Sequence, residues 1–289
     1  MEYGFFGFNT GPLSNAGAIE RVVVSAEQLG YESVWSAEHL VMMDPEDPVL
    51  PVPPKSNLVG SIASLAFAAA KTERIRIGSG IILIALRDPI MLAKELAAVD
   101  VLSGGRLLAG FGVGFVPREF ETLGIPFEER GARTSEHIEV LRTLWTEEQP
   151  AFDGQFTKFS GVQSRPLPVQ KPHPPIILGG DSPPALRRAV AQADGWYSFH
   201  DVEGTAQMLK ALEEAAKTTE RPASLGRLNI IVSPFGPIDA DTAKRYEDLG
   251  VDRLVLVRDS FETSIPPSRE AEDTIVRFLE DQARDIGIG

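Results

Sequence analysis

Short apolar runs alternate with longer amphipathic segments along the whole chain. In residues 18–29, for example, Ile19, Val22 and Ala26 recur three and four positions apart, which places them on one face of a helix. The predicted strands are residues 3–9, 33–36, 75–85, 106–111, 175–178, 195–199, 227–232 and 253–257. The predicted helices are residues 18–29, 58–70, 89–102, 130–145, 183–193, 205–216, 240–249 and 270–285.

This regular alternation, with no change of composition midway, predicts one fold unit. We expect a (β/α)8 TIM barrel with parallel strands, formed by a single domain over residues 1–289, rather than a doubly wound sheet. The longest interruption, residues 112–174, is predicted to be an insertion between the fourth and fifth strands that forms a lid or pocket wall. Functional residues are expected at the C-terminal ends of the strands, where such barrels carry their active sites.

The composition narrows the chemistry. The sequence contains 28 Lys and Arg against 41 Asp and Glu, a formal net charge of −13, which argues against nucleic acid or an anionic membrane surface as a partner. Because the sequence has no Cys, disulfides and thiolate nucleophiles are excluded, and redox chemistry needs a bound cofactor. The sequence shows neither a signal-peptide pattern nor an apolar stretch of membrane-spanning length, so we expect a cytoplasmic protein.

His39 is the sharpest candidate for catalysis, because it follows the second predicted strand directly in the segment Ser36-Ala37-Glu38-His39. An imidazole at this position can orient a cofactor ring or move a proton near neutral pH. A loop histidine bonded to a backbone carbonyl fits the position equally well. His200, at the end of the sixth strand, is a further candidate. No His and carboxylate spacing typical of metal ligands occurs, so no metal is expected.

Three glycine-rich segments also fall on strands or strand ends. Residues 78–81 (GSGI) interrupt the third strand, which indicates a bulge, the close approach of a flat ligand, or relief of crowding inside the barrel. Residues 110–114 (GFGVG) lack the spacing of a dinucleotide-binding turn, but their amides are candidates for contacts with phosphate or ring carbonyls. Residues 179–183 (GGDSP) precede a helix and favour an anion, although an ordinary turn has the same pattern.

Taken together and in this order, several segments resemble the bacterial luciferase-like family over nearly the whole chain. They are residues 26–35 (AEQLGYESVW), Glu38-His39, residues 75–80 (IRIGSG), Arg87-Asp88-Pro89, residues 100–106 (DVLSGGR), Glu119-Phe120-Glu121, Arg130-Gly131, Gly179-Gly180 and residues 193–196 (ADGW). Within that family the chain is most similar to the F420-dependent oxidoreductases. The resemblance implies a deazaflavin that lies across the C-terminal ends of the barrel strands.

The resemblance also implies a set of site residues. It places a non-prolyl cis peptide at Gly80-Ile81 behind the central ring and assigns His39 to ring contact and catalysis, with Glu38 before it where the family usually has Asp. The cofactor-binding residues so implied are Glu38, His39, Ser79, Gly80, Ile81, Gly112, Gly114, Gly179, Gly180 and Ser182, the last three as a phosphate-binding turn. The substrate pocket so implied is Met43, Phe115 and Trp196.

The implied activity is hydride transfer between C5 of F420 and a small, hydrophobic organic substrate. Phe115 and Met43 stand where the family's sugar-phosphate dehydrogenases have an acidic residue and Trp, which indicates a more apolar pocket. Val113 stands where luciferase-type members often carry a basic residue for the flavin phosphate, which favours F420 over FMN. The alternatives are an FMN-dependent monooxygenase and a cofactor-binding barrel without turnover. A homodimer is common in the family and is expected here.

Overall fold

The computed structural model describes residues 1–50, 52–258 and 265–288. Its centre is a closed parallel barrel in the order β3-β2-β1-β11-β10-β9-β8-β5, with β5 paired to β3. β4 pairs with β5 and continues the third strand of the barrel. The strands are β1 (Glu2–Phe6), β2 (Ser33–Ser36), β3 (Arg76–Ser79), β4 (Ile82–Leu83), β5 (Leu107–Gly112), β8 (Ile176–Gly179), β9 (Gly195–Phe199), β10 (Asn229–Ser233) and β11 (Arg253–Leu256). The predicted TIM barrel is therefore confirmed.

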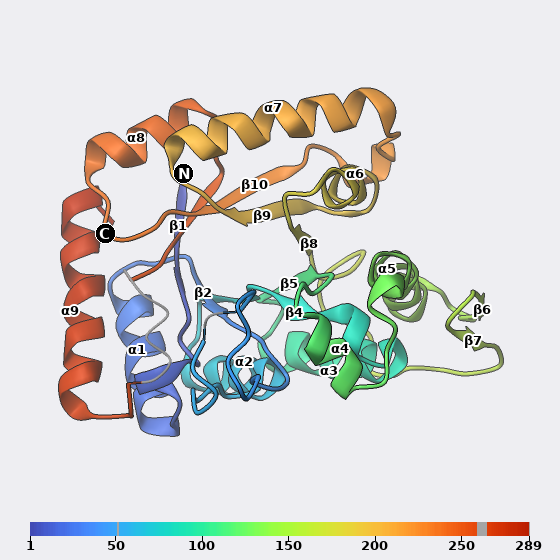
Figure 1. The fold of residues 1–289 in the computed structure, drawn as a ribbon, viewed down its shortest axis with the longest axis horizontal. Coiled ribbons are helices and arrows are strands. Elements are labelled where there is room, and N and C mark those ends of the chain that lie inside the picture. Colours follow the sequence, from blue (N-terminus) through green and yellow to red (C-terminus); the bar gives the residue numbers. More distant parts are fainter. Residues whose placement is uncertain (51, 259–264, 289) are drawn as a thin grey trace.

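An outer layer of helices surrounds the barrel (Figure 1). The helices are α1 (Ala16–Gln28), α2 (Ser61–Lys71), α3 (Pro89–Leu102), α5 (Arg130–Thr146), α6 (Pro183–Gln192), α7 (Val202–Thr218), α8 (Ala240–Asp248) and α9 (Arg269–Ile286). Each packs against the next, and α9 returns to α1 (Figure 1). Side chains of Asn15, Asp88 and Asp201 accept backbone N–H groups at helix starts, as N-caps do. Within the described ranges, no helix has both the length and the apolar character of a membrane span.

Aromatic side chains fill the barrel interior. Phe6, Trp35 and Tyr197 belong to a buried cluster that is separate from the larger one between strands and helices. The rings of Trp35 and Tyr197 stack with 5.4 Å between centroids, and burial raises the pKa of the Tyr197 hydroxyl, which is bonded to Ser233. A Cβ at Gly78 would lie 2.6 Å from the Trp35 ring. Relief of crowding inside the barrel therefore accounts for Gly78.

The third strand differs from the single strand predicted over residues 75–85. It is divided into β3 and β4 at Gly80-Ile81, and the peptide bond between these residues is cis, as the resemblance implied. A 3-10 helix, Ile84–Leu86, follows β4 directly. The division moves the segment after β4 out of the barrel wall, where it meets the insertion.

The insertion after β5 contains more structure than the one helix predicted there. It comprises α4 (Pro117–Thr122), a 3-10 helix (Phe127–Glu129), α5 and the antiparallel hairpin of β6 (Phe152–Asp153) and β7 (Lys158–Phe159). The hairpin extends beyond α5 at the right of Figure 1. Phe120 of α4 is fully buried in a cluster with Leu83 and Leu86. This packing fixes α4 beside the end of the third strand, close to the loop that follows β2.

Candidate active site at the strand C-termini

His39 lies in the loop after β2 and is held there by a carboxylate from the insertion. Its Nδ1 is 3.1 Å from Oε2 of Glu119, a residue of α4 that is 1% exposed. The other oxygen, Oε1, accepts the backbone N–H of Leu40 at 2.6 Å. Nε2 of His39 has no hydrogen-bond partner within the described part of the chain, and the side chain is 17% exposed. The imidazole is thus fixed through one nitrogen, and the other is available to a ligand.

Glu38 does not share this role, because its carboxylate is already engaged elsewhere. Oε1 accepts the backbone N–H of Leu83 at 2.9 Å, and Arg87 donates from Nε at 3.1 Å and from Nη2 at 2.6 Å. The Glu38 side chain is 1% exposed. Glu38 therefore ties the loop after β2 to β4 and does not present a free carboxylate to a cofactor. The sequence-based expectation for Glu38 is corrected accordingly.

At the bulge between β3 and β4, the Ile81 side chain packs over two glycines. A Cβ at Gly112 would lie 2.3 Å from Cδ1 of Ile81, and a Cβ at Gly179 would lie 2.5 Å from the same atom. The glycines at the ends of β5 and β8 therefore make the seat for the Ile81 side chain. A Cβ at Gly80 would lie 3.1 Å from the rings of both Phe6 and Tyr197, so the bulge also closes over the aromatic interior.

Ser79 and Gly114 support this end of the barrel from within. The Ser79 hydroxyl is fully buried and bonds both the N–H and the C=O of Gly110 at 2.8 Å, so it links β3 to β5 rather than facing a cofactor. Gly114 has φ +79°, a conformation that favours glycine, and a Cβ there would lie 2.6 Å from Phe120. Both residues shape the site through the backbone, and for Ser79 the predicted direct contact is corrected.

The turn after β8 carries a charge that the sequence-based expectation left out. Gly180 is exposed with φ +114°, and the hydroxyl of Ser182, the N-cap of α6, makes no capping bond. Asp181 accepts the Ser198 hydroxyl at 2.6 Å and lies 3.1 Å from Nε2 of His200. Because α6 begins with two prolines, its first turn also has fewer N–H donors than usual. An anion bound here would meet the carboxylate of Asp181, which pairs with the His200 ring when that ring is protonated.

The three predicted pocket residues have different positions. Phe115 is 51% exposed, and its ring meets the His39 ring edge-on with 5.9 Å between centroids. Met43 is buried in a cluster with Val116. Trp196 is fully buried between barrel and helices, and its Nε1 donates to the C=O of Gly180. The prediction that Trp196 lines an open face is therefore wrong.

Phe235 was not predicted, although it lies at the same end of the barrel, just after β10. It is 65% exposed, and its ring is 6.3 Å from that of Phe199, which in turn meets Phe6 edge-on at 5.3 Å. A row of rings thus leads from the barrel interior to the surface. The signal in the sequence was an aromatic residue after a strand end, in Ser233-Pro234-Phe235.

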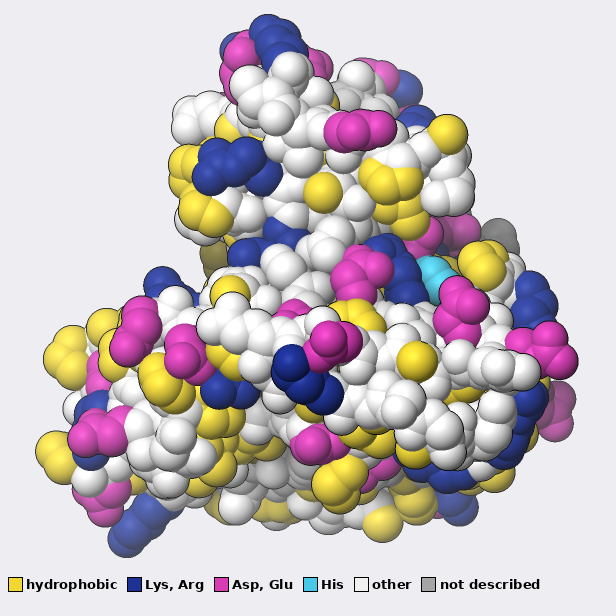
Figure 2. Space-filling model, turned by 90° about the vertical axis from the view of Figure 1, so that its right-hand side faces the viewer, with side chains coloured by type: hydrophobic (Ala, Val, Ile, Leu, Met, Phe, Trp, Pro, Cys, Tyr) yellow, Lys and Arg dark blue, Asp and Glu magenta, His cyan; other side chains and the backbone are white. Residues whose placement is uncertain are grey.

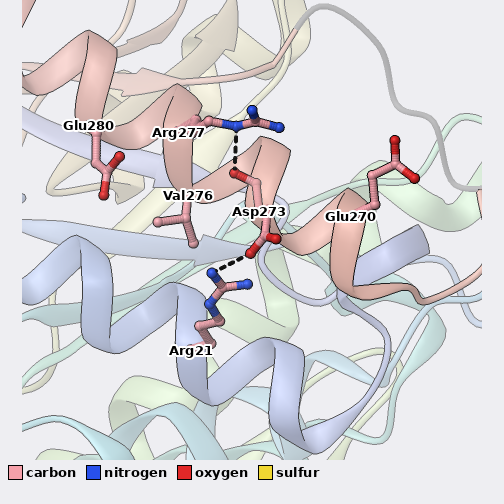
Figure 3. Close-up of a pocket in the computed structure, with 6 residues that line it drawn as sticks. All are labelled: Arg21, Glu270, Asp273, Val276, Arg277 and Glu280. Atoms are coloured by element: carbon pink, nitrogen blue, oxygen red, sulfur yellow. Dashed lines mark hydrogen bonds and ion pairs between the residues drawn. The ribbon is translucent and has the colours of Figure 1, made fainter.

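A hollow lies outside the barrel, in the groove between α1 and α9 (Figure 3). It is lined by Arg21 of α1 and by Glu270, Asp273, Val276, Arg277 and Glu280 of α9. Arg21 pairs with the Asp273 carboxylate at 2.5 Å, and Arg277 donates to the Asp273 C=O at 3.3 Å. Because the Arg21–Asp273 pair joins the two helices, we interpret the groove as packing of the outer layer.

The described residues hold no group of three His, Asp or Glu side chains able to bind a metal ion. On the face shown in Figure 2, the described Lys and Arg side chains lie in small groups among Asp and Glu and form no continuous basic surface.

Residues 1–280 match the family model of the luciferase-like monooxygenases. The chain belongs to this family. It is 32% identical over 214 residues to the protein Rv0953c of Mycobacterium tuberculosis, a match that covers 73% of this chain and 70% of the relative.

Solved structures of the family share the fold. A monooxygenase, RslO1 of Streptomyces bottropensis, is 26% identical with a TM-score of 0.65 and is matched over 98% of this chain and 80% of its own. An F420-dependent secondary alcohol dehydrogenase, solved with an F420-acetone adduct, has a TM-score of 0.76 over 99% of this chain and 98% of its own. At 15% identity the second likeness concerns the fold alone.

Proposed function

We propose that the protein is an F420-dependent oxidoreductase that transfers a hydride between C5 of the deazaflavin and a small, hydrophobic organic substrate. The observation that carries this proposal is the environment of His39: Nδ1 is bonded to a buried carboxylate, Nε2 has no partner in the described chain, and an exposed aromatic ring lies beside it. Hydride transfer to or from a carbon that bears oxygen requires a proton to move at that oxygen. A histidine fixed in this way can accept or return that proton through its free nitrogen.

The residues at the barrel mouth fit the ring of such a cofactor. Ile81 is only partly buried and presents an apolar surface. The glycines beneath it, Gly112 and Gly179, have no side chains that would occupy the space of the Ile81 side chain. Gly180 and the hydroxyl of Ser182 would hold an anionic group, with His200 balancing Asp181. When bound, the deazaflavin would supply the hydride chemistry, which protein side chains do not provide. The chain's own residues would orient the two reactants, exclude water and move the proton at His39 Nε2.

A second candidate is a flavin monooxygenase with the same fold. The likeness to RslO1, described as a monooxygenase, favours it. Against it stands Val113, in the loop after β5, where a basic side chain would be expected to meet the flavin phosphate. A third candidate, a barrel that binds the cofactor without turnover, is supported by Phe115 in the place of an acidic residue.

The decisive experiment is a side-by-side titration of the purified protein with F420 and FMN, in which binding is measured by fluorescence quenching. We expect saturable binding of F420 and much weaker binding of FMN. Tight FMN binding without F420 binding would overturn the proposal in favour of the second candidate. If F420 binds but no hydride exchange occurs across a broad panel of alcohols and ketones, the third candidate is supported. The His39→Ala variant should lose turnover, and unchanged turnover with unchanged F420 affinity would remove His39 from the mechanism.

A further inference from the structure

We propose that Glu119 is a positioning residue that fixes the neutral His39 ring in one tautomer, with its proton on Nδ1 and its lone pair on Nε2. An ionised carboxylate only accepts hydrogen bonds, so the atom that meets Oε2 must carry a proton. That atom is Nδ1 of His39, at 3.1 Å. The ring nitrogen left unprotonated is then Nε2, the one with no partner in the described chain.

The burial of Glu119 favours this proton arrangement when its carboxylate is ionised. A buried charge is strongly unfavourable unless it is hydrogen-bonded or paired. Glu119 is 1% exposed, and its two oxygens have one donor each, the Leu40 N–H at 2.6 Å and the His39 ring. If Nδ1 carried no proton, one carboxylate oxygen would be left without a donor and would face a lone pair. For an ionised Glu119, a donor on each carboxylate oxygen therefore requires the His39 tautomer with its proton on Nδ1.

The helix that carries Glu119 is itself anchored to the His39 loop. Arg118, its neighbour in α4, donates to the C=O of Pro45 at 2.8 Å and of Asp44 at 3.3 Å, further along the same loop. The next residue of α4, Phe120, is fully buried beneath Gly114. Three consecutive residues thus bind the loop, the histidine and the core, which leaves the imidazole little freedom to turn.

The role of this tautomer in proton transfer rests on the proposed function. In substrate oxidation, a bound deazaflavin would accept the hydride that leaves the carbon, and His39 would take the hydroxyl proton on its Nε2 lone pair as the C–O bond becomes C=O. The ring is then an imidazolium whose Nδ1–H remains on Glu119. In the reverse direction, Nε2 returns the proton to the carbonyl oxygen as the hydride arrives. The opposite tautomer would present an N–H to the hydroxyl and could accept no proton.

The test is ¹⁵N NMR of the histidine side chains in the full-length protein without cofactor, with His39 assigned by its loss in His39→Asn. We expect a protonated Nδ1 and an unprotonated Nε2 in the neutral ring. In Glu119→Gln the amide oxygen can still accept from Leu40, so its NH2 faces Nδ1 as a donor and the proton should move to Nε2. Glu121→Gln, which changes an exposed carboxylate of the same helix, is the matched control and should leave the signals unchanged.

A protonated Nε2 in the wild-type neutral ring would overturn the proposal, even if Glu119→Gln did not fold. An unchanged tautomer in folded Glu119→Gln would overturn it as well. If the tautomer reverses as expected but wild-type protein moves no hydride from 2-propanol or any other alcohol to F420, then the proposed function fails and the positioning role of Glu119 stands. Where turnover is found, Glu119→Gln should lower kcat by about 100-fold or more with little change in KM.

Discussion

Replacing Gly112 by Ala tests whether the Ile81 side chain depends on the missing Cβ of β5. A Cβ there would lie 2.3 Å from Cδ1 of Ile81 and 3.0 Å from its Cγ1. Cδ1 also lies 2.5 Å from the position that a Cβ on Gly179 would take, so the Ile81 side chain fills the space over both glycines and must shift when that space is occupied. Overpacking of this kind lowers stability by about 1–3 kcal/mol. We expect Gly112→Ala to lose a similar amount.

A second substitution, Ile81→Val, tests whether the stability lost in Gly112→Ala is caused by the contact with Cδ1 of Ile81. Ile81→Val removes Cδ1, the atom nearest to both glycines, and by itself lowers stability by about 0.5–1.5 kcal/mol. Without that atom, Gly112→Ala keeps only the looser contact with Cγ1, and Gly→Ala at a compatible backbone position stabilises by about 0.4–1 kcal/mol. The loss caused by Gly112→Ala should therefore fall close to zero in the protein that already carries Ile81→Val. The coupling between the two sites should reach at least about 1 kcal/mol.

The assay is urea unfolding of the four proteins of this cycle, followed by tryptophan fluorescence and circular dichroism. Gly17→Ala in α1 is the matched control, since its Cβ would have no neighbour closer than 3.5 Å, and it should be stabilising by about 0.5–1 kcal/mol. Equal destabilisation by Gly112→Ala with and without the Ile81→Val substitution would refute the reasoning, because the Ile81 side chain would then not be the obstacle.

Two further predictions concern buried charges. Arg87→Met leaves the Glu38 carboxylate with the Leu83 N–H alone, so urea unfolding should show that the free energy of unfolding falls by about 3 kcal/mol. Adding Glu38→Gln should recover most of this loss. An Arg87→Met variant as stable as wild type would contradict the prediction. Burial lowers the pKa of His137 from its ordinary value of 6.5, while its ring is bonded to the C=O of Ile84. The unfolded chain therefore binds the proton more readily, so stability is full above pH 6.5 and falls as the pH drops below it. His137→Gln should flatten this fall between about pH 7 and about pH 5, and an unchanged slope would show that other groups cause it.

The fold could be predicted from the sequence because strand and helix spacings are local. The break at Gly80-Ile81 was located by its glycines, and the seat it requires on Gly112 and Gly179 was not, since those residues meet only when the barrel closes. Trp196 was misplaced for a different reason. Two aromatic residues, Trp196 and Tyr197, stand side by side in β9, and the alternation of a short strand does not say which one faces inward.

For the candidate site, the place of His39 in the chain could be predicted from the sequence, whereas its hydrogen-bond partner could not. His39 was found because it follows a strand end, and its contact with Phe115 follows from two strand ends meeting at one mouth. Glu119 belongs to the segment Glu119-Phe120-Glu121, but its bond to a residue 80 positions earlier depends on how the insertion folds back. Likewise Glu38 and Arg87 both stand in segments that carry the family resemblance, but their pairing, which engages the Glu38 carboxylate, forms only in the tertiary structure.

Glu119 belongs to the insertion after β5, so engineering of that insertion also affects His39. The insertion after β5 looks like an exchangeable module, attached to the barrel and open to replacement by the corresponding segment of a relative. Yet it contributes the carboxylate that holds His39, and Arg118 from the same short helix fastens the loop on which His39 lies. A chimera that imports a different insertion therefore also exchanges the histidine's support. Grafts intended to alter substrate preference should carry their own β2 loop with them, or retain residues 117–122 from this chain.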